Sequence, residues 1–240
     1  MNKIDTNNLP KHIGIIMDGN GRWAKTKGKL RLFGHKSGVK AVRETVEMSA
    51  QIGIKFLTLY AFSTENWSRP KSEVKSLMRL LISSINSETK TLLKNNIKLK
   101  SIGDTNLLPH DAKEQLNSSI EKTKNNNRMT LILALSYSGR WDIISAVKKI
   151  IKHKITSDKI DEQLFEQYLS TKNVPNPELL IRTSGEYRIS NFLLWQSAYS
   201  EFYFTDTLWP DFRKSDLEKA IIDFQSRERR FGKVSSQVQN

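Results

Sequence analysis

The 240-residue chain contains no cysteine. This absence excludes disulfide bonds, thiolate metal ligands and a cysteine nucleophile. No segment approaches the ~18 consecutive apolar residues that a membrane-spanning helix requires, and the N-terminus lacks the apolar segment of a signal peptide. We therefore expect a cytoplasmic protein. The nucleotide-binding patterns Gly-x-x-x-x-Gly-Lys-Ser/Thr and Gly-x-Gly-x-x-Gly are also missing after every predicted strand, and the four histidines are too scattered for a zinc site.

Positive charge is abundant, because 39 Lys and Arg residues face 25 Asp and Glu residues, which gives a formal net charge of +14. Such a balance is typical of proteins that bind nucleic acids, phosphorylated substrates or anionic lipids. Many lysines occupy predicted solvent-exposed helix faces and carry little information. Several arginines follow apolar strands directly, which favours phosphate recognition. A basic RNA-binding or DNA-binding protein is the alternative, although the aromatic residues form no recognisable RNA-binding motif. We expect no nucleic-acid partner.

Apolar segments of strand length alternate with segments of helical periodicity, which is typical of an α/β fold with a largely parallel sheet. Most strand segments are almost continuously apolar, as strands covered on both faces should be. We predict a single domain at residues 1–232, with a central six-stranded sheet flanked by helices, and a polar tail at 233–240. The predicted strands are Ile13–Met17, Phe56–Phe62, Ile97–Ile102, Met129–Leu135, Leu179–Arg182 and Phe202–Phe204. The predicted helices are Lys36–Gln51, Ser72–Asn95, Pro109–Lys124, Trp141–Lys152, Asp161–Leu169 and Ser215–Arg227.

The first strand runs directly into an acid, two glycines and an arginine. Ligands bind at such strand ends in α/β sheets. Gly19 and Gly21 allow backbone N–H groups to converge on an anion, and Arg22 adds a planar donor for phosphate oxygens. Asp18 would repel a phosphate unless a divalent cation lay between them, which indicates Mg²⁺. An ordinary tight turn with an incidental acid is the alternative.

Basic groups recur further along the chain. Arg31 and His35 precede a predicted helix, whose N-terminus favours anions. The second strand ends in a polar segment in which Ser63, Glu65, Asn66 and Arg69 could orient a polar headgroup, and Trp67 could supply an apolar wall. A solvated strand-to-helix loop is the alternative.

Two arginines and a serine surround a glycine turn after the fifth strand, which indicates a second anion site at Arg182, Arg188 and Ser190. Glu201, just before the last strand, could complete a metal site or pair with an arginine. The helix Ser72–Asn95 carries a wide apolar stripe. Core packing explains that stripe, although the helix could also wall a groove for a hydrocarbon tail.

These segments together resemble the cis-prenyltransferase family, and in particular its bacterial members that make undecaprenyl diphosphate. The resemblance runs from His12 to about Gly232 and rests on HIGIIMDGNGRWAK, FGHKSG, LYAFSTENWSRP, RTSGEYRISNF and LWPDF. It implies a fold with a hydrophobic tunnel, Mg²⁺ as the cofactor, and the cis condensation of isopentenyl diphosphate with farnesyl diphosphate. The implied product is undecaprenyl diphosphate, a precursor of the lipid carrier of peptidoglycan synthesis.

The resemblance also implies residue roles. Asp18 and Asn66 would be catalytic, and Asp18 and Glu201 would bind the metal. Asn66 is a poor base, so we expect it to position a water or diphosphate oxygen that takes the proton. The implied substrate-binding residues are Gly19, Asn20, Gly21, Arg22, Trp23, Arg31, His35, Ser63, Thr64, Glu65, Trp67, Arg69, Arg182, Arg188, Ile189 and Ser190.

The family pattern further implies a homodimer, because Arg230-Phe231-Gly232 matches a C-terminal Arg-x-Gly element that reaches the partner's site. A lipid product implies transient contact with the inner face of the membrane. The chain departs from the pattern at Tyr187, where many bacterial members have His, and at Ser136 and Ser138, within a segment that is commonly Asn-Tyr-Gly-Gly-Arg. A noncatalytic subunit of a heteromeric prenyltransferase is the remaining alternative, but the retained Asp18 and Asn66 favour an active enzyme.

Overall fold

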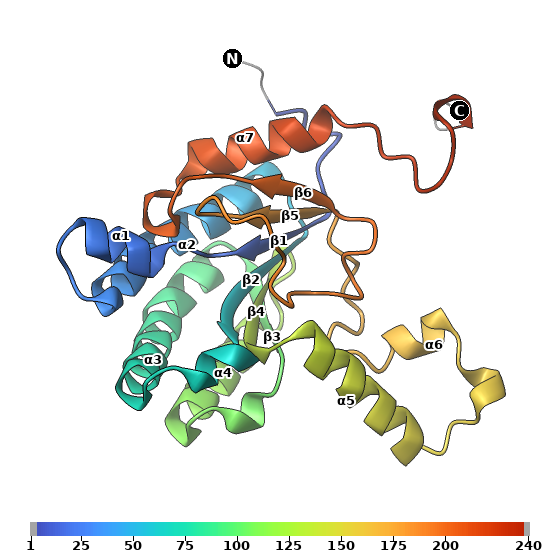
Figure 1. Cartoon of the computed structure of the whole chain (residues 1–240), viewed down its shortest axis with the longest axis horizontal. Coiled ribbons are helices and arrows are strands. Elements are labelled where there is room, and N and C mark those ends of the chain that lie inside the picture. The colour runs from blue at the N-terminus through green and yellow to red at the C-terminus, as the bar shows by residue number, and fades with distance from the viewer. Residues whose placement is uncertain (1–3, 238–240) are drawn as a thin grey trace.

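The centre of the computed structural model, which describes residues 4–237, is a sheet of six parallel strands in the order β3-β4-β2-β1-β5-β6 (Figure 1). The strands are β1 (His12–Ile16), β2 (Phe56–Ser63), β3 (Ile97–Ile102), β4 (Met129–Tyr137), β5 (Leu179–Arg182) and β6 (Glu201–Phe204). Every neighbouring pair is parallel. The six predicted strands and the α/β class are confirmed, and each strand end lies within two residues of its predicted position.

Helices cover the sheet and bury their apolar faces against it. They are α1 (Asn20–Thr26), α2 (Arg31–Ile52), α3 (Lys71–Lys94), α4 (His110–Thr123), α5 (Gly139–Lys152), α6 (Glu162–Glu166) and α7 (Lys214–Gln225). Short 3₁₀ helices include η1 (Thr64–Ser68), η2 (Thr105–Leu107) and η4 (Trp209–Asp211). The larger apolar core lies between the strands and α2, α3, α4 and α7. A smaller core packs Phe192, Leu193 and Trp141 of α5 against the other face.

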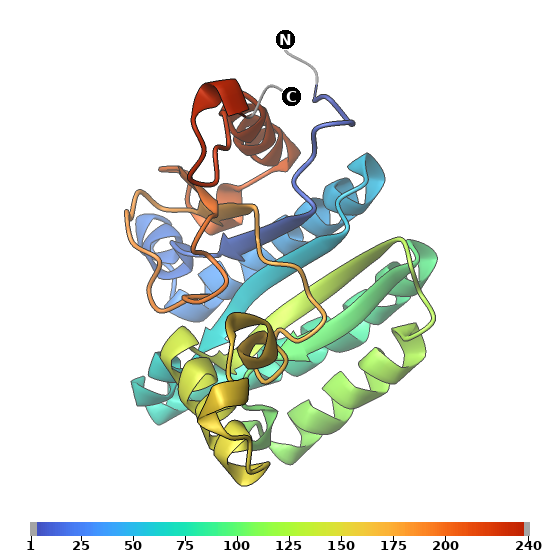
Figure 2. The same ribbon diagram turned by 90° about the vertical axis from the view of Figure 1, so that its right-hand side faces the viewer.

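The first and last segments of the described chain lie on the same side of the molecule, near α7 (Figure 2). Gln225, at the end of α7, accepts a hydrogen bond from the Asp5 backbone N–H at 3.2 Å and donates one to the Asp5 carbonyl at 2.6 Å. Beyond α7 the segment to residue 237 extends away from the body (Figure 1). Residues 238–240 of the predicted polar tail lie outside the described residues.

Three predicted helices, α3, α5 and α7, begin one or two residues early, and larger differences occur at α1 and α2. The segment after β1, where no helix was predicted, forms α1, and α2 begins at Arg31 instead of Lys36. Gly19 makes the first difference possible, because its φ of 102° lies in the left-handed region that glycine adopts without strain. The Gly19 carbonyl then accepts the Trp23 backbone N–H at 2.9 Å and starts the helix. The observed α6 is also shorter than the helix predicted at Asp161–Leu169.

His12 is buried at the start of β1, and its two ring nitrogens lie 2.6 Å from the Pro175 carbonyl oxygen and 2.7 Å from Thr58 Oγ1. Burial lowers its pKa to about 4, despite the Pro175 hydrogen bond and the nearby Glu178, which both raise it. The unfolded chain therefore takes up a proton at a higher pH than the folded chain does.

We expect the free energy of unfolding to fall as the pH drops from about 6.5 towards 4, by on the order of 3 kcal/mol from His12. Urea unfolding across this range would measure it. His12→Gln should flatten the slope while lowering stability at pH 7. An unchanged slope in the variant would contradict the assignment.

Candidate active site

Three predicted segments meet at the carboxyl edge of the sheet. β1 pairs with β2 on one side and with β5 on the other, so the residues that follow these strands are neighbours. Asp18 follows β1, Ser63 ends β2, and Arg182 ends β5. The structure thus brings together side chains that are more than 160 residues apart in the chain.

Asp18 and Arg182 form the centre of this edge. Arg182 Nη2 donates to Asp18 Oδ2 at 2.8 Å, and Arg182 Nη1 donates to Ser190 Oγ at 2.6 Å and to the Arg188 carbonyl. The Arg182 side chain is only 5% exposed, whereas that of Asp18 is 35% exposed. The arginine is therefore held in place by the protein, and the carboxylate keeps one side open to the pocket.

The ionisation of Asp18 reflects two opposing causes. Partial burial raises the pKa of its carboxyl group, but hydrogen bonds from Arg182 and the Gly19 N–H, with the charges of Arg182 and Arg22, lower the pKa overall. Asp18 is therefore a carboxylate at neutral pH and can serve as a metal ligand.

Arg69 lines both cavities at this edge of the sheet. Arg31 lies beside it through a shared acidic partner, and Arg22 lies beside Asp18. Arg31 and Arg69 share the carboxylate of Glu73 at 3.6 Å and 3.2 Å, and Arg22 lies 3.3 Å from Glu186. These acids hold the guanidinium groups in position without closing the pocket. Rigid guanidinium forks are suited to bidentate binding of phosphate oxygens.

His35 lies among these cations in the second turn of α2. Burial, and then the positive charges of Arg69 and Arg31, lower its pKa to about 4, against the opposing effect of Glu73. The imidazole is therefore neutral at pH 7. Its Nε2 atom and Asn20 Oδ1 are buried and have no hydrogen-bond partner among the described residues, and the same is true of Arg182 Nε. Buried polar atoms of native proteins are normally paired, so these three are candidates for contact with a ligand.

The segment after β2 forms the 3₁₀ helix η1. Asn66 Oδ1 accepts the Ser63 backbone N–H at 3.1 Å, which leaves the Asn66 amide nitrogen to donate. This arrangement suits an orienting group better than a proton acceptor. Glu65 accepts a hydrogen bond from Asn191 at 2.8 Å, and Thr64 Oγ1 donates to Glu65 at 3.2 Å.

Trp67 and Trp23 occupy different walls. Trp67 Nε1 donates to Ser136 Oγ at 2.9 Å, and its ring packs edge-on against Phe62. Trp23 lies on α1 and stacks on Phe33, with ring centroids 5.9 Å apart. Both were predicted to line the site, but neither is among the residues that line the two central cavities.

The segment after β5 presents the remaining predicted anion ligands. Arg188 is exposed and pairs with Glu186, and Ile189 is half-buried. Ser190 and Asn191 have left-handed backbone conformations, with φ of 48° and 62°. This unusual backbone turns Ser190 Oγ back towards Arg182.

Glu201 lies away from the other predicted site residues. It begins β6 opposite Leu179, at the amino edge of the sheet, and Arg227 Nη1 donates to it at 2.9 Å. Asp18 lies at the carboxyl edge, where Ile16 is opposite Arg182. A metal ion shared by Asp18 and Glu201 would therefore need ligands from more than one chain. The described residues contain no cluster of three His, Cys, Asp or Glu side chains.

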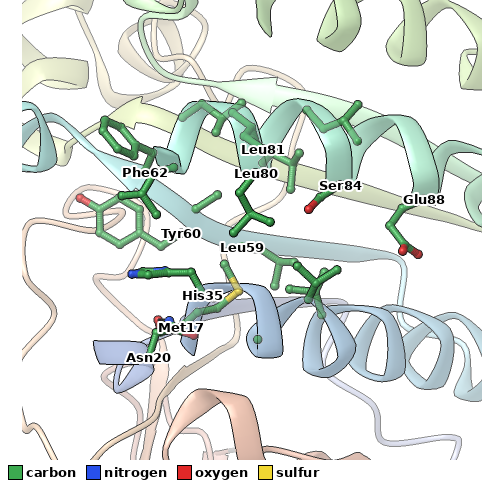
Figure 3. A pocket seen from close by; sticks show the side chains of 18 of the residues that line it. Met17, Asn20, His35, Leu59, Tyr60, Phe62, Leu80, Leu81, Ser84 and Glu88 are labelled. Carbon is green, nitrogen blue, oxygen red and sulfur yellow. Dashed lines mark hydrogen bonds between the residues drawn. The ribbon is translucent and has the colours of Figure 1, made fainter. Parts of the chain in front are cut away.

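Two cavities join at this edge of the sheet. A polar pocket of about 600 Å³ is lined by Asp18, Arg182 and Ser190, among others. An apolar cavity of about 240 Å³ continues between the sheet and α3 (Figure 3). The two share Met17, Tyr60, Asn66 and Arg69 as lining residues.

The apolar cavity extends deep into the larger core. Its walls include Leu77, Leu81 and Ile85 of α3, so the stripe of this helix, for which core packing was the favoured explanation, also faces a cavity. Leu131, Leu133 and Leu135 of β4 and Leu99 of β3 line it as well. In Figure 3, Asn20 and His35 lie at one end and Glu88 at the other. The arrangement accommodates a molecule with an anionic head and an apolar tail.

Sequence reasoning missed several residues that organise the site. Thr183 Oγ1 accepts the Asp18 backbone N–H at 2.9 Å and donates to the Asp18 carbonyl at 2.7 Å. Ser184 accepts a hydrogen bond from Arg22. Arg140 and Asn191 line the polar pocket. The signal for Thr183 and Ser184 was present, because both follow a predicted strand directly.

The described part of the chain includes no helix that is long and apolar enough to cross a membrane.

Comparison with known proteins agrees with this geometry. Residues 16–232 match a family model described as "Putative undecaprenyl diphosphate synthase". The chain belongs to this family. An "Isoprenyl transferase" of Chlorobaculum tepidum is 56% identical over 96% of this chain and 88% of its own length. A "Ditrans,polycis-undecaprenyl-diphosphate synthase ((2E,6E)-farnesyl-diphosphate specific)" of Pasteurella multocida is 52% identical over 97% of this chain and 98% of its own length.

Solved structures show the same fold. A lavandulyl diphosphate synthase from Lavandula x intermedia, in complex with dimethylallyl diphosphate, superposes with a TM-score of 0.91 at 40% identity, covering 94% of this chain and 99% of its own. A "probable undecaprenyl diphosphate synthase" from Campylobacter jejuni superposes with a TM-score of 0.80 at 35% identity, covering 94% and 100%. The resemblance to the cis-prenyltransferase family is confirmed.

The three departures from the family pattern have distinct surroundings. Tyr187 is exposed, and its ring centroid lies 5.2 Å from that of Phe204. Ser136 accepts the Trp67 indole hydrogen bond, and Ser138 caps α5 by accepting the Trp141 backbone N–H. Ser136 thus holds the Trp67 ring in position, and Ser138 stabilises the start of α5.

Proposed function

We propose that this protein is a cis-prenyltransferase that condenses isopentenyl diphosphate with farnesyl diphosphate and extends the chain to undecaprenyl diphosphate. The junction between the polar pocket and the apolar cavity carries this proposal. An allylic diphosphate can bind its head among the arginines and its tail along α3. The names of the relatives from Pasteurella multocida and Haemophilus influenzae support farnesyl diphosphate as the first acceptor.

In each round, C1 of the allylic chain bonds to C4 of isopentenyl diphosphate, the bond between C1 and diphosphate breaks, and a proton leaves C2 of the isopentenyl unit. Negative charge grows on the departing diphosphate. Arg22, Arg31, Arg69 and the neutral His35 would stabilise that charge. Arg182, Arg188 and Ser190 would bind the isopentenyl diphosphate, and Asn66 would orient the oxygen that receives the proton.

Mg²⁺ fits this donor set. The ion usually keeps several waters and binds through one or two carboxylates together with substrate phosphates. Asp18 offers a half-exposed carboxylate beside the arginines. When bound, Mg²⁺ would neutralise diphosphate charge as a Lewis acid. Asp18 would hold it, and Arg182 would keep the carboxylate oriented.

Incubation of the purified protein with radiolabelled isopentenyl diphosphate, farnesyl diphosphate and Mg²⁺ tests the activity. We expect a Mg²⁺-dependent product that comigrates with undecaprenyl diphosphate. A shorter or longer product would retain the chemistry and overturn the product assignment. No incorporation by the folded protein would favour the noncatalytic subunit, and salt-dependent RNA retention would favour the nucleic-acid alternative.

The distal end of the apolar cavity is closed by an ion pair between α2 and α3. Glu88 lines the cavity and is 15% exposed, and Arg43 Nε donates to its two carboxylate oxygens at 2.9 Å and 3.2 Å. We expect Glu88→Ala to open this end, because it removes both the side chain and the link between the helices. Products should shift to longer chains, as measured by chromatography. Lys40→Ala, which disrupts only a surface pair with Glu44, is the control; an unchanged product distribution in Glu88→Ala would refute the closing role.

A homodimer is part of the proposal. Ile144, Val147 and Ile151 form an exposed apolar stripe on α5, at helical spacing. The segment that carries Arg230 and Gly232 projects from the body, as an arm that reaches a second chain would. We expect Ile144→Glu/Ile151→Glu to lower the mass measured by sedimentation equilibrium towards that of one chain. A wild-type protein that sediments as a monomer at micromolar concentration would contradict the dimer.

Contact with the inner face of a membrane also belongs to the proposal, because the product has a long apolar tail.

A further inference from the structure

The corner between α1 and α2 exposes two large apolar side chains. Leu30, which precedes α2, is 85% exposed, and Phe33 in its first turn is 44% exposed. The loop that joins the two helices lies at the edge of the molecule (Figure 1). Single exposed apolar residues are common and need no explanation by themselves. The surrounding charge distinguishes this corner.

Residues 22–36 contain six Lys and Arg residues and no Asp or Glu, in a chain whose net charge is +14. Both arginines of this segment are paired with acids, Arg22 with Glu186 and Arg31 with Glu73. By contrast, Lys25, Lys27, Lys29 and Lys36 are exposed and form no ion pair with the described residues. They precede and follow Leu30 and Phe33 in sequence. Four exposed lysines without an acidic partner among the described residues therefore surround one apolar corner.

We propose that this corner, defined by Leu30 and Phe33 with Lys25, Lys27, Lys29 and Lys36, docks the protein on the anionic surface of a lipid bilayer. Leucine and phenylalanine side chains enter the boundary between headgroups and acyl chains, while lysines bind lipid phosphates. Each lysine near an anionic surface contributes modestly, so binding depends on the cluster and weakens with salt.

Other occupants fit this corner less well. In a symmetric contact between two copies the same patch faces itself, which would bring the two lysine clusters together. A nucleic acid would bind the lysines but leave Leu30 in water. A bilayer satisfies both the apolar and the cationic parts.

The corner belongs to the same helices as the pocket. Asn20 of α1 and His35 of α2 both line the apolar cavity. Docking at Leu30 therefore holds the pocket mouth close to the bilayer. This consequence rests on the proposed function, since it would let an apolar product leave without crossing water, but the docking itself does not depend on activity.

Sedimentation with vesicles tests the docking without any substrate. We expect the protein to bind vesicles of phosphatidylcholine with phosphatidylglycerol, to bind pure phosphatidylcholine weakly, and to dissociate as salt is raised. Leu30→Ser/Phe33→Ser should weaken binding to the anionic vesicles by about tenfold or more. Lys25→Glu/Lys29→Glu should weaken it at low salt and remove most of the salt dependence.

Two control variants isolate the corner. Leu93, near the end of α3, is 43% exposed, almost the same as Phe33, so Leu93→Ser makes a matched apolar loss elsewhere. Lys90→Glu/Lys94→Glu makes the matched charge reversal on α3, at the same spacing of four residues. Both should bind as wild type does, and thermal unfolding should confirm that all variants are folded. If the corner variants bind as tightly as the wild type, or if anionic lipid makes no difference, the proposal is wrong. Failure of the prenyl-transfer assay would leave this result unchanged.

Discussion

Replacement of Asp18 by Asn should lower turnover by roughly a thousandfold or more while the protein stays folded. The carboxylate is the metal ligand of the proposed mechanism, and an amide binds Mg²⁺ poorly. The fold should tolerate the change, because an Asn oxygen can still accept the hydrogen bond that Arg182 Nη2 donates at 2.8 Å. Thr183 also continues to hold the backbone of residue 18 through both of its hydrogen bonds. Steady-state kinetics and thermal unfolding measure the two effects.

Binding without metal separates this role from a structural one. The Asp18 carboxylate repels a diphosphate when no cation lies between them. Asp18→Asn should therefore bind farnesyl diphosphate at least as well as the wild type in EDTA, and Mg²⁺ should no longer improve that binding. Asp158→Asn is the control, because Asp158 is an exposed acid on the short helix after α5. Parallel losses of melting temperature and activity in Asp18→Asn would show that Asp18 serves the fold instead.

The secondary structure was largely predictable because most strands of a buried parallel sheet are almost continuously apolar segments of strand length. β3 and β5 were predicted at their observed bounds. β5 is a short, almost continuously apolar segment, and the edge strand β3 alternates Ile97 and Leu99 with Lys98 and Lys100. α1 was missed because Gly-Asn-Gly is typical of turns. Its helix depends on a tertiary setting, in which Gly19 packs against Leu208 and Ser184.

The sequence predicted site residues that directly follow strands. It could not predict which strands are neighbours in the sheet, and therefore which of these residues meet. Asp18, Asn66 and Arg182 come together because the ends of parallel neighbouring strands meet at one edge. The same rule places Glu201 at the other edge, because it begins a strand instead of ending one. Sequence distance carries no information about the strand order, so the adjacency of β5 to β1 could not be derived from the residues alone. The roles assigned to these side chains stay predictions until their variants are measured.

Replacement of Gly34 by Ala should have the second large effect on activity, because this glycine lets α1 pack closely on α2. It lies on α2, and a Cβ atom at this position would be 1.9 Å from the carbonyl oxygen of Asn20 and 3.3 Å from the Cβ of Ala24. Glycine is normally unfavourable inside a helix, and Ala would add about 1 kcal/mol of helix propensity. At this position the added Cβ would overlap the backbone of α1. The steric cost exceeds the gain in helix propensity, so α1 must move away from α2.

Gly34→Ala should therefore lower kcat/KM by about a hundredfold, because a shift of about 1 Å in a catalytic group has an effect of this size. Stability should fall by about 1–3 kcal/mol, as in other overpacked sites. Asn20 and Arg22 would move with α1, whereas Arg182 would stay on β5, so the apparent affinity for farnesyl diphosphate should fall more than that for isopentenyl diphosphate. Ser37→Ala, on the same helix, introduces no new contact and serves as the control. Equal losses for the two substrates, or full activity in Gly34→Ala, would show that the packing of α1 on α2 does not position the site.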